Sequence, residues 1–181
     1  MASDTGLGGS PWRIAGWGLA VLALLTPFLA MQFTGEVNWT GSDFIFAAVL
    51  IGGVGLLFEL TVRLSGEKSY RAGVGLALAA SFLTVWASGA VGMIGDEGNP
   101  LDLMFAGVLA VALLGAAIAG FRPGGMARAM AVAAAAQLAA SVAGMFTDLR
   151  GGVFSAMFAL IWLASAAMFR RAERTLRRKP A

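Results

Sequence analysis

Six apolar runs, each close to the length that a helix needs to cross a lipid bilayer, limit this chain more than any other feature. A helix rises about 1.5 Å per residue, so about 20 residues cross a hydrocarbon core of about 30 Å. The runs cover residues 14–33, 44–62, 72–94, 101–121, 125–146 and 153–169, with short connections between them. The sequence therefore predicts an all-α fold: a polytopic bundle of six transmembrane helices.

The composition agrees with this fold class. Apolar residues make up 59% of the chain and charged residues only 13%, whereas soluble domains are about half apolar and a quarter charged. Cysteine and histidine are absent, which excludes disulfides, thiolate chemistry and metal or haem ligation through these residues. We expect no cofactor. Because the positive charges behind the pI of about 10.2 lie in short loops and one tail, where membrane topology explains them, we expect no nucleic-acid partner.

The two ends flank one membrane domain. We predict a disordered cytoplasmic N-terminus at residues 1–13, the six-helix domain at residues 14–169, and a basic cytoplasmic tail at residues 170–181. The first run could instead be a secretory signal, but it is longer than the usual core of about 7–15 residues and its positive region is weak. Cleavage there would leave five helices in the same orientation.

Orientation follows from the lysines and arginines of the short loops, which favour the cytoplasmic side. The opposite side carries acidic residues and a single Arg150. This asymmetry predicts that both termini are cytoplasmic. Twelve of the thirteen Lys and Arg residues fall on the predicted cytoplasmic side: Arg13, Arg63, Lys68, Arg71, Arg122, Arg128, Arg170, Arg171, Arg174, Arg177, Arg178 and Lys179.

Two helix pairs resemble each other along the chain, residues 44–94 and residues 101–146. A tandem duplication would relate them by an axis along the membrane normal, and the alternative is chance similarity between apolar helices with Asp at one end and Arg at the other. At identical spacing, Asp43, Phe46, Ala47, Val49, Leu50 and Arg63 match Asp102, Phe105, Ala106, Val108, Leu109 and Arg122.

Polar residues within the apolar runs are the candidates for an intramembrane path. Glu59 has Arg63 four residues later, so an interfacial ion pair is favoured over an ion or proton site. Gln137 and Ser141 lie one turn apart, at a depth similar to that of Ser81 and Thr84 in the run 72–94. Hydrogen bonds between these two helices are favoured over a polar substrate pocket.

Two charged clusters lie outside the runs. The predicted outer side carries Asp43, Asp96, Glu97, Asp102 and Asp148, whose oxygens suit a divalent cation or a basic partner. Acidic residues also crowd outer loops without a function, and no EF-hand spacing occurs, so we predict no metal site. The basic tail consists of Arg170, Arg171, Arg174, Arg177, Arg178 and Lys179; it either attracts anionic lipids or fixes the last helix.

Small residues at helical spacing are the main packing pattern, because close backbone approach drives helix association in lipid. Ala129 with Ala133, and Ala136 with Ala140 and Gly144, repeat every four residues in the run 125–146. Gly89, Gly92 and Gly95 repeat every three residues at the end of the run 72–94. We expect these two helices to lie at the centre of the bundle.

Three segments resemble a group of small bacterial inner-membrane proteins of unassigned function. They are VWASGAVGMIGDEGNP at residues 85–100, LMFAGVLAV at residues 103–111 and RPGGMARAM at residues 122–130. The resemblance implies a bacterial inner-membrane setting and no particular chemistry. It leaves out the first and last predicted helices, which we interpret as additions that serve assembly.

No phosphate-binding loop, GxSxG or HExxH motif, or carboxylate pair on one helix face occurs. We therefore expect no enzyme, and we interpret the chain as a structural or accessory subunit of a membrane complex or homo-oligomer. The first alternative is a small transporter or channel for a cation or small polar solute. The second is a lipid-interacting protein that uses its basic face.

Overall fold

The computed structural model describes residues 11–90, 92–95 and 99–178, and all regular structure among them is helical. Six helical stretches of this part of the chain are long and apolar enough to cross a membrane, with α6 and α7 together forming the last one. The predicted fold class is confirmed. The elements are α1 (Pro11–Phe33), α2 (Gly41–Leu64), α3 (Lys68–Ala90), the 3-10 helix η1 (Pro100–Asp102), α4 (Leu103–Ile118), α5 (Pro123–Met145), α6 (Leu149–Ala156) and α7 (Phe158–Arg177).

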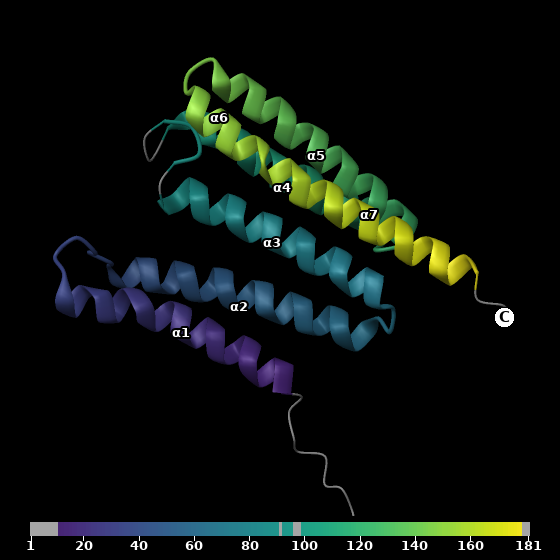
Figure 1. The fold of residues 1–181 in the computed structure, drawn as a ribbon, viewed down its shortest axis with the longest axis horizontal. Coiled ribbons are helices and arrows are strands. Elements are labelled where there is room, and N and C mark those ends of the chain that lie inside the picture. The colour runs from purple at the N-terminus through teal and green to yellow at the C-terminus, as the bar shows by residue number, and fades with distance from the viewer. Residues whose placement is uncertain (1–10, 91, 96–98, 179–181) are drawn as a thin grey trace, which may run out of the picture. The chain divides into compact units, whose positions relative to one another are not determined.

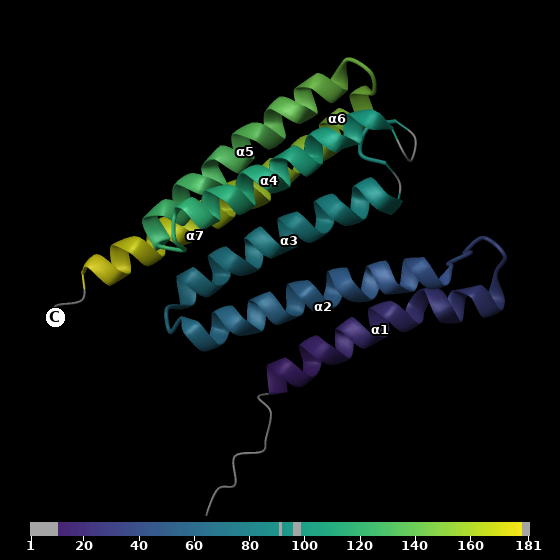
Figure 2. The same ribbon diagram turned by 180° about the vertical axis from the view of Figure 1, so that it is seen from behind.

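The chain divides into two compact units, residues 1–59 and residues 60–181. In the first unit, α1 and α2 lie side by side as an antiparallel hairpin, as Figure 1 and Figure 2 show from opposite sides. The ring of Phe44 stands edge-on to Phe28, at a centroid distance of 6.4 Å, and to Trp39, at 5.2 Å. Aromatic contacts of this kind add about 0.5–1.5 kcal/mol to burial, so they help to close the loop end of the hairpin.

The start of α2 is fixed by Thr40. Its backbone N–H and its hydroxyl both donate to Oδ2 of Asp43, at 2.7 Å each. The Asp43 side chain thus reaches back to the residue before the helix, as in a capping box. One residue of the predicted outer acidic cluster therefore serves its own helix terminus.

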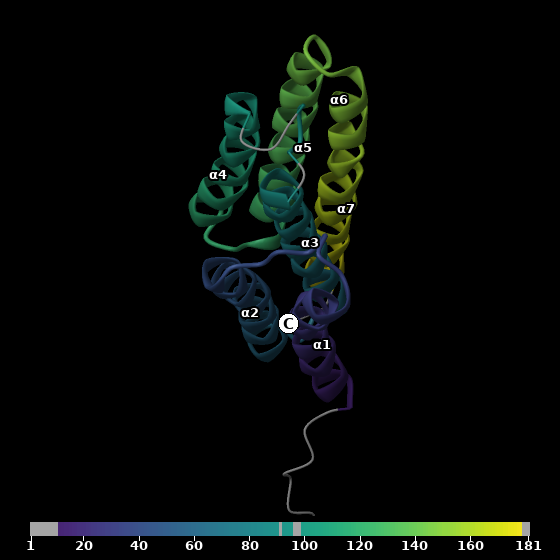
Figure 3. The same cartoon turned by 90° about the vertical axis from the view of Figure 1, so that its left-hand side faces the viewer.

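In the second unit, α5 packs against α4 on one side and against α6 and α7 on the other (Figure 3). Its small residues allow this, since Ala133 and Gly144 are buried and Gly115 of α4 lies directly on Ala129. A Cβ atom at Gly115 would stand 2.8 Å from the Cβ atom of Ala129. The predicted central position of this helix is confirmed for the unit. The other helix expected there, α3, packs mainly against α7 and only sparsely against α4.

The end of α3 differs from the prediction. The helix stops at Ala90 instead of Ile94, and Gly92 and Gly95 adopt φ values of 76° and 70°. These left-handed conformations favour glycine and belong to a turn. Met93 and Ile94 within this turn are 1% and 0% exposed. The expected glycine stripe is therefore wrong: Gly92 and Gly95 form a turn that buries two apolar side chains.

The boundaries of α4 are shifted for similar local reasons. Asn99 and Pro100 begin a helical segment as predicted, with Oδ1 of Asn99 accepting the N–H of Leu101 at 3.0 Å. The α-helix ends at Ile118, before Gly120 and Phe121, which have φ values of 53° and 57°. The hydroxyl of Tyr70 donates to the carbonyl of Phe121 at 2.8 Å, so α3 holds the turn in which α4 ends.

The last helical span is longer than predicted at both ends. It covers Leu149–Arg177, 29 residues, with a short interruption at Met157 between α6 and α7. The helix α7 continues past the predicted start of the tail, and Phe169 and Ala172 are both fully buried. Residues 170–177 are thus part of a helix, and Lys179 lies outside the described residues. The helix-pair duplication stays a prediction.

The contact between Gly115 and Ala129 predicts the effect of adding one methyl group. Gly115→Ala should lower the free energy of unfolding by about 1–3 kcal/mol, because the new Cβ atom meets a helix backbone that cannot rotate away. Gly107→Ala on the same helix is the matched control, since nothing lies within 4 Å of its Cβ position. It should be neutral or stabilising by up to about 1 kcal/mol. Denaturation in mixed detergent micelles measures both, and equal effects would contradict this packing.

Candidate functional site

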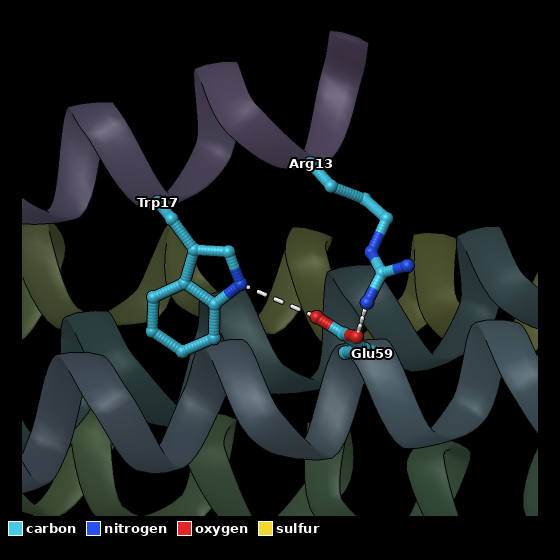
Figure 4. A network of polar contacts seen from close by, with 3 residues as sticks. All are labelled: Arg13, Trp17 and Glu59. Carbon is cyan, nitrogen blue, oxygen red and sulfur yellow. Dashed lines mark hydrogen bonds and ion pairs between the residues drawn. The ribbon is translucent and has the colours of Figure 1, made fainter. Parts of the chain in front are cut away.

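Glu59 of α2 is bound by two residues of α1. The guanidinium of Arg13 forms an ion pair with Oε1, and Nε1 of Trp17 donates to Oε2 at 3.2 Å (Figure 4). The side chain of Glu59 is 14% exposed, whereas that of Arg13 is 38% exposed. The prediction paired Glu59 with Arg63 on its own helix. The partners from α1 were not predicted, because nothing in the sequence relates residue 13 to residue 59.

Gly55 gives Trp17 its place in this cluster. A Cβ atom at Gly55 would lie 3.1 Å from Cη2 of the indole, so the ring rests on the bare backbone of α2. A small cavity of about 120 Å³ adjoins the cluster. Its walls come from both helices: Arg13, Gly16, Trp17, Ala20, Ile51, Gly55, Phe58 and Glu59.

Gln137 and Ser141 form a buried polar cluster with Ser155 of α6. Gln137 donates from Nε2 to the carbonyl of Ser155 at 3.0 Å, and the hydroxyl oxygens of Ser155 and Ser141 are 2.8 Å apart. All three residues are 0% exposed. Oε1 of Gln137 is buried without a hydrogen-bond partner. The cluster therefore joins α5 to α6 in the core of the unit.

The expected partners from the run 72–94 are wrong. Ser81 donates to the carbonyl of Ala77 at 2.9 Å, and Thr84 to that of Ala80 at 2.8 Å. Both hydroxyl groups thus bond to their own helix, four residues back, as Ser and Thr commonly do in apolar helices. Hydrogen bonding between two helices was the correct expectation for Gln137, but the second helix is α6 rather than α3.

Asp102 and Asp148 hold the turn that follows α3. The two carboxylate oxygens of Asp102 accept the N–H groups of Met93 and Ile94, each at 2.9 Å. Oδ2 of Asp148 accepts the N–H of Gly95 at 3.0 Å. These bonds satisfy three amides that have left the helix, and carboxylates are strong acceptors for such groups. The carboxylates thus fasten three separate loops at one end of the unit.

Asp148 also begins α6. Its Oδ1 accepts the N–H of Arg150 at 3.0 Å, which makes it the N-cap of that helix. The pKa of Asp148 lies below its ordinary value, first because of the hydrogen bond from Gly95 and then because of one from Gly151. The charged form is therefore the one that this loop stabilises.

No group of three acidic side chains able to hold a metal ion occurs among the described residues. Asp96 and Glu97 of the predicted outer cluster lie outside them. The arginines of the basic tail that are described, which extend to Arg178, are exposed along and just after the last turns of α7. Arg177 pairs with Glu173 at 2.8 Å. Glu173 also lies against Gly124 at the start of α5.

A groove between α3 and α4 was not predicted. These helices approach each other sparsely and leave a half-open cavity of about 510 Å³. Thr84 and Asp102 were candidates for other reasons, and Ser88 was not predicted, although Thr84 and Ser88 are four residues apart and so share a helix face. The lining residues are Thr84, Val85, Ser88, Asn99, Pro100, Asp102, Leu103, Ala106 and Leu109.

A scan against protein-family models and searches of curated proteins and of solved structures gave no match to this chain.

The ion pair of the first unit predicts a measurable coupling. Arg13→Gln and Glu59→Gln should each destabilise the protein, and the double variant should lose less than the sum of the two. We expect a coupling free energy of about 0.5–1 kcal/mol, because solvent reaches the Arg13 side chain and weakens the ion pair. Free energies of unfolding in mixed micelles give this value. Strictly additive losses would mean that the two side chains do not interact.

The carboxylate of Asp148 predicts a pH dependence. Its pKa is lowered in the folded protein, so its stabilisation is complete above the ordinary value of 3.8 and is lost as the pH falls through the folded value. Asp148→Asn should therefore be less stable than wild type at neutral pH, since it keeps a cap for Arg150 but loses the bond to Gly95. The difference should shrink as the pH falls below the ordinary value of 3.8.

Thermal unfolding between about pH 2 and pH 7 measures this difference. Glu36→Gln is the control, because Glu36 is an exposed carboxylate in the loop between α1 and α2. It should leave the unfolding temperature at neutral pH unchanged. A deficit of Asp148→Asn that stays constant over the whole pH range would contradict the assignment.

Proposed function

We propose that this protein is a non-catalytic structural or accessory subunit of a membrane assembly, either a homo-oligomer or a larger complex. Its setting would be the bacterial inner membrane, with both termini in the cytoplasm, as the arginine pattern and the resemblance to small bacterial membrane proteins favour. No cofactor is part of the proposal. Membrane lipids and neighbouring membrane proteins would be its partners.

The use of the polar side chains is the observation that supports this proposal. Glu59 joins two helices, Gln137 joins two others, and Asp102 fastens the turn after α3. A transport path or a catalytic centre needs polar groups that can engage a substrate. Here the candidate groups hold the fold, which is the arrangement expected of a scaffold.

A small transporter or channel is the second candidate. Oε1 of Gln137 favours it, because this carbonyl oxygen is buried without a donor and a buried polar group without a partner is costly. A solute or a water molecule that donates to this oxygen would remove the cost. Binding of anionic lipids by the exposed arginines of α7 is the third candidate, supported by their position at one helix end.

Native mass spectrometry of the protein, tagged at its C-terminus and extracted gently without overexpression, tests the first proposal. We expect a complex of fixed stoichiometry, homomeric or heteromeric, that persists in Glu59→Gln. A second tagged membrane protein from the same cells is the control for chance association. A lone monomer would contradict the proposal, and solute flux in proteoliposomes that Glu59→Gln or Gln137→Glu alters would favour the transporter instead.

A further inference from the structure

The groove between α3 and α4 is a half-open cavity with mostly apolar walls. Val85 lines it from α3, and Leu103, Ala106 and Leu109 line it from α4. Both helices are long and apolar enough to cross a membrane. If this cavity of about 510 Å³ were empty, the side chains that line it would lose van der Waals contacts. Water in it would find few hydrogen-bond partners along the apolar walls. A hydrocarbon chain meets this need.

The groove also has a polar end. Oγ of Ser88 is buried there and has no hydrogen-bond partner. A buried hydroxyl group without a partner costs about 1–3 kcal/mol. Binding of a ligand that accepts a hydrogen bond from this hydroxyl would remove that cost. The hydroxyl of Thr84, one turn earlier, already donates a hydrogen bond to the carbonyl of Ala80. Ser88 is thus the free donor, and an ester or phosphate oxygen is a suitable acceptor.

The charge of the groove restricts the ligand further. Asp102 lies at the polar end, and its oxygens bind two backbone N–H groups. No Lys or Arg is among the described residues that line it. An anionic head group would therefore meet a carboxylate without a counter-charge, whereas an ammonium group would be attracted to it. The complementarity favours a zwitterionic head that carries an ammonium group.

We propose that this groove binds one zwitterionic phospholipid with an amine-bearing head group. One acyl chain lies between α3 and α4, an oxygen of the lipid accepts a hydrogen bond from the hydroxyl of Ser88, and the ammonium group lies near Asp102. This site goes beyond the proposed subunit role, with which it shares Asp102 alone. Loss of the lipid would leave the assembly test unaffected.

Lipid retention by the full chain tests the proposal. The purified protein is delipidated in mild detergent and mixed with phosphatidylethanolamine or phosphatidylglycerol of the same acyl chains, and native mass spectrometry counts the lipids that survive collisional activation. We expect one retained phosphatidylethanolamine per chain and at least a fewfold weaker retention of phosphatidylglycerol.

Three variants locate the site. Ala106→Phe fills the groove and should lower retention by about tenfold or more. Ala117→Phe is its control, because Ala117 is exposed on the same face of α4, three turns further along and outside the groove. Ser88→Ala removes the free donor and should lower retention by about three- to tenfold. Its stability without lipid should not fall, since the hydroxyl has no partner in the protein.

The opposite results would overturn the site. Equal retention of the two lipids, preference for phosphatidylglycerol, or no retained lipid would each contradict the proposed ligand. Equal retention by Ala106→Phe and Ala117→Phe would show that bound lipids lie around the protein rather than in the groove. A loss of stability in lipid-free Ser88→Ala would mean that this hydroxyl serves the fold.

Discussion

The second unit depends on how closely its helix backbones approach α5. In lipid, apolar surface alone does not draw helices together, so packing between small residues has to supply the attraction. Gly115 meets Ala129 on one side of α5, and a Cβ atom at Gly152 of α6 would stand 2.8 Å from the carbonyl oxygen of Ser141 on another. The helices α4, α6 and α7 all pack against α5. A larger side chain at one of these contacts would therefore displace the other helices as well.

Polar side chains at the end of this closely packed unit form hydrogen bonds with its own backbone. Inside a bilayer, every N–H and carbonyl group that leaves a helix needs a partner in the protein. At the turn after α3, Asp102 and Asp148 supply those partners, and the turn buries Met93 and Ile94 at the end of the unit. The acidic residues that suggested a cation site thus have a structural explanation within the described loops.

The groove between α3 and α4 differs from these loops, because one of its polar groups has no hydrogen-bond partner in the protein. The side of the unit between α3 and α4 is packed sparsely, and it combines an apolar wall with one hydroxyl group that lacks a partner. A ligand site needs this combination, because apolar surface gives affinity and a few polar groups fix orientation. Elsewhere in the described unit, Ser155 and Asp102 bond to other groups of the protein. Asp102 is common to the lipid and the subunit proposals, whereas Ser88 belongs to the lipid site alone.

The sequence predicted the spans better than their ends. A membrane span is recognised from the length and the hydropathy of its own residues, so the six predicted runs correspond to six helical spans. The end of α3 was missed because the carboxylate that accepts the N–H of Ile94 comes from Asp102, beyond the turn. The start of α4 was found because Asn99 and Pro100 act on their own helix, whereas the helical continuation of α7 past Phe169 depends on burial of that ring and of Ala172.

By itself, the sequence determined that the chain is an all-α protein with six helices able to cross a membrane, because chain length and apolar composition decide solvation in lipid. It also singled out Glu59 and Gln137 as polar residues within the apolar runs. Only the tertiary structure decided that Arg13 and Trp17 bind Glu59, that Ser155 binds Gln137, and that Ser88 lines a groove. Which residues become neighbours depends on which helices pack together. The sequence around each residue does not indicate a contact with a residue far along the chain.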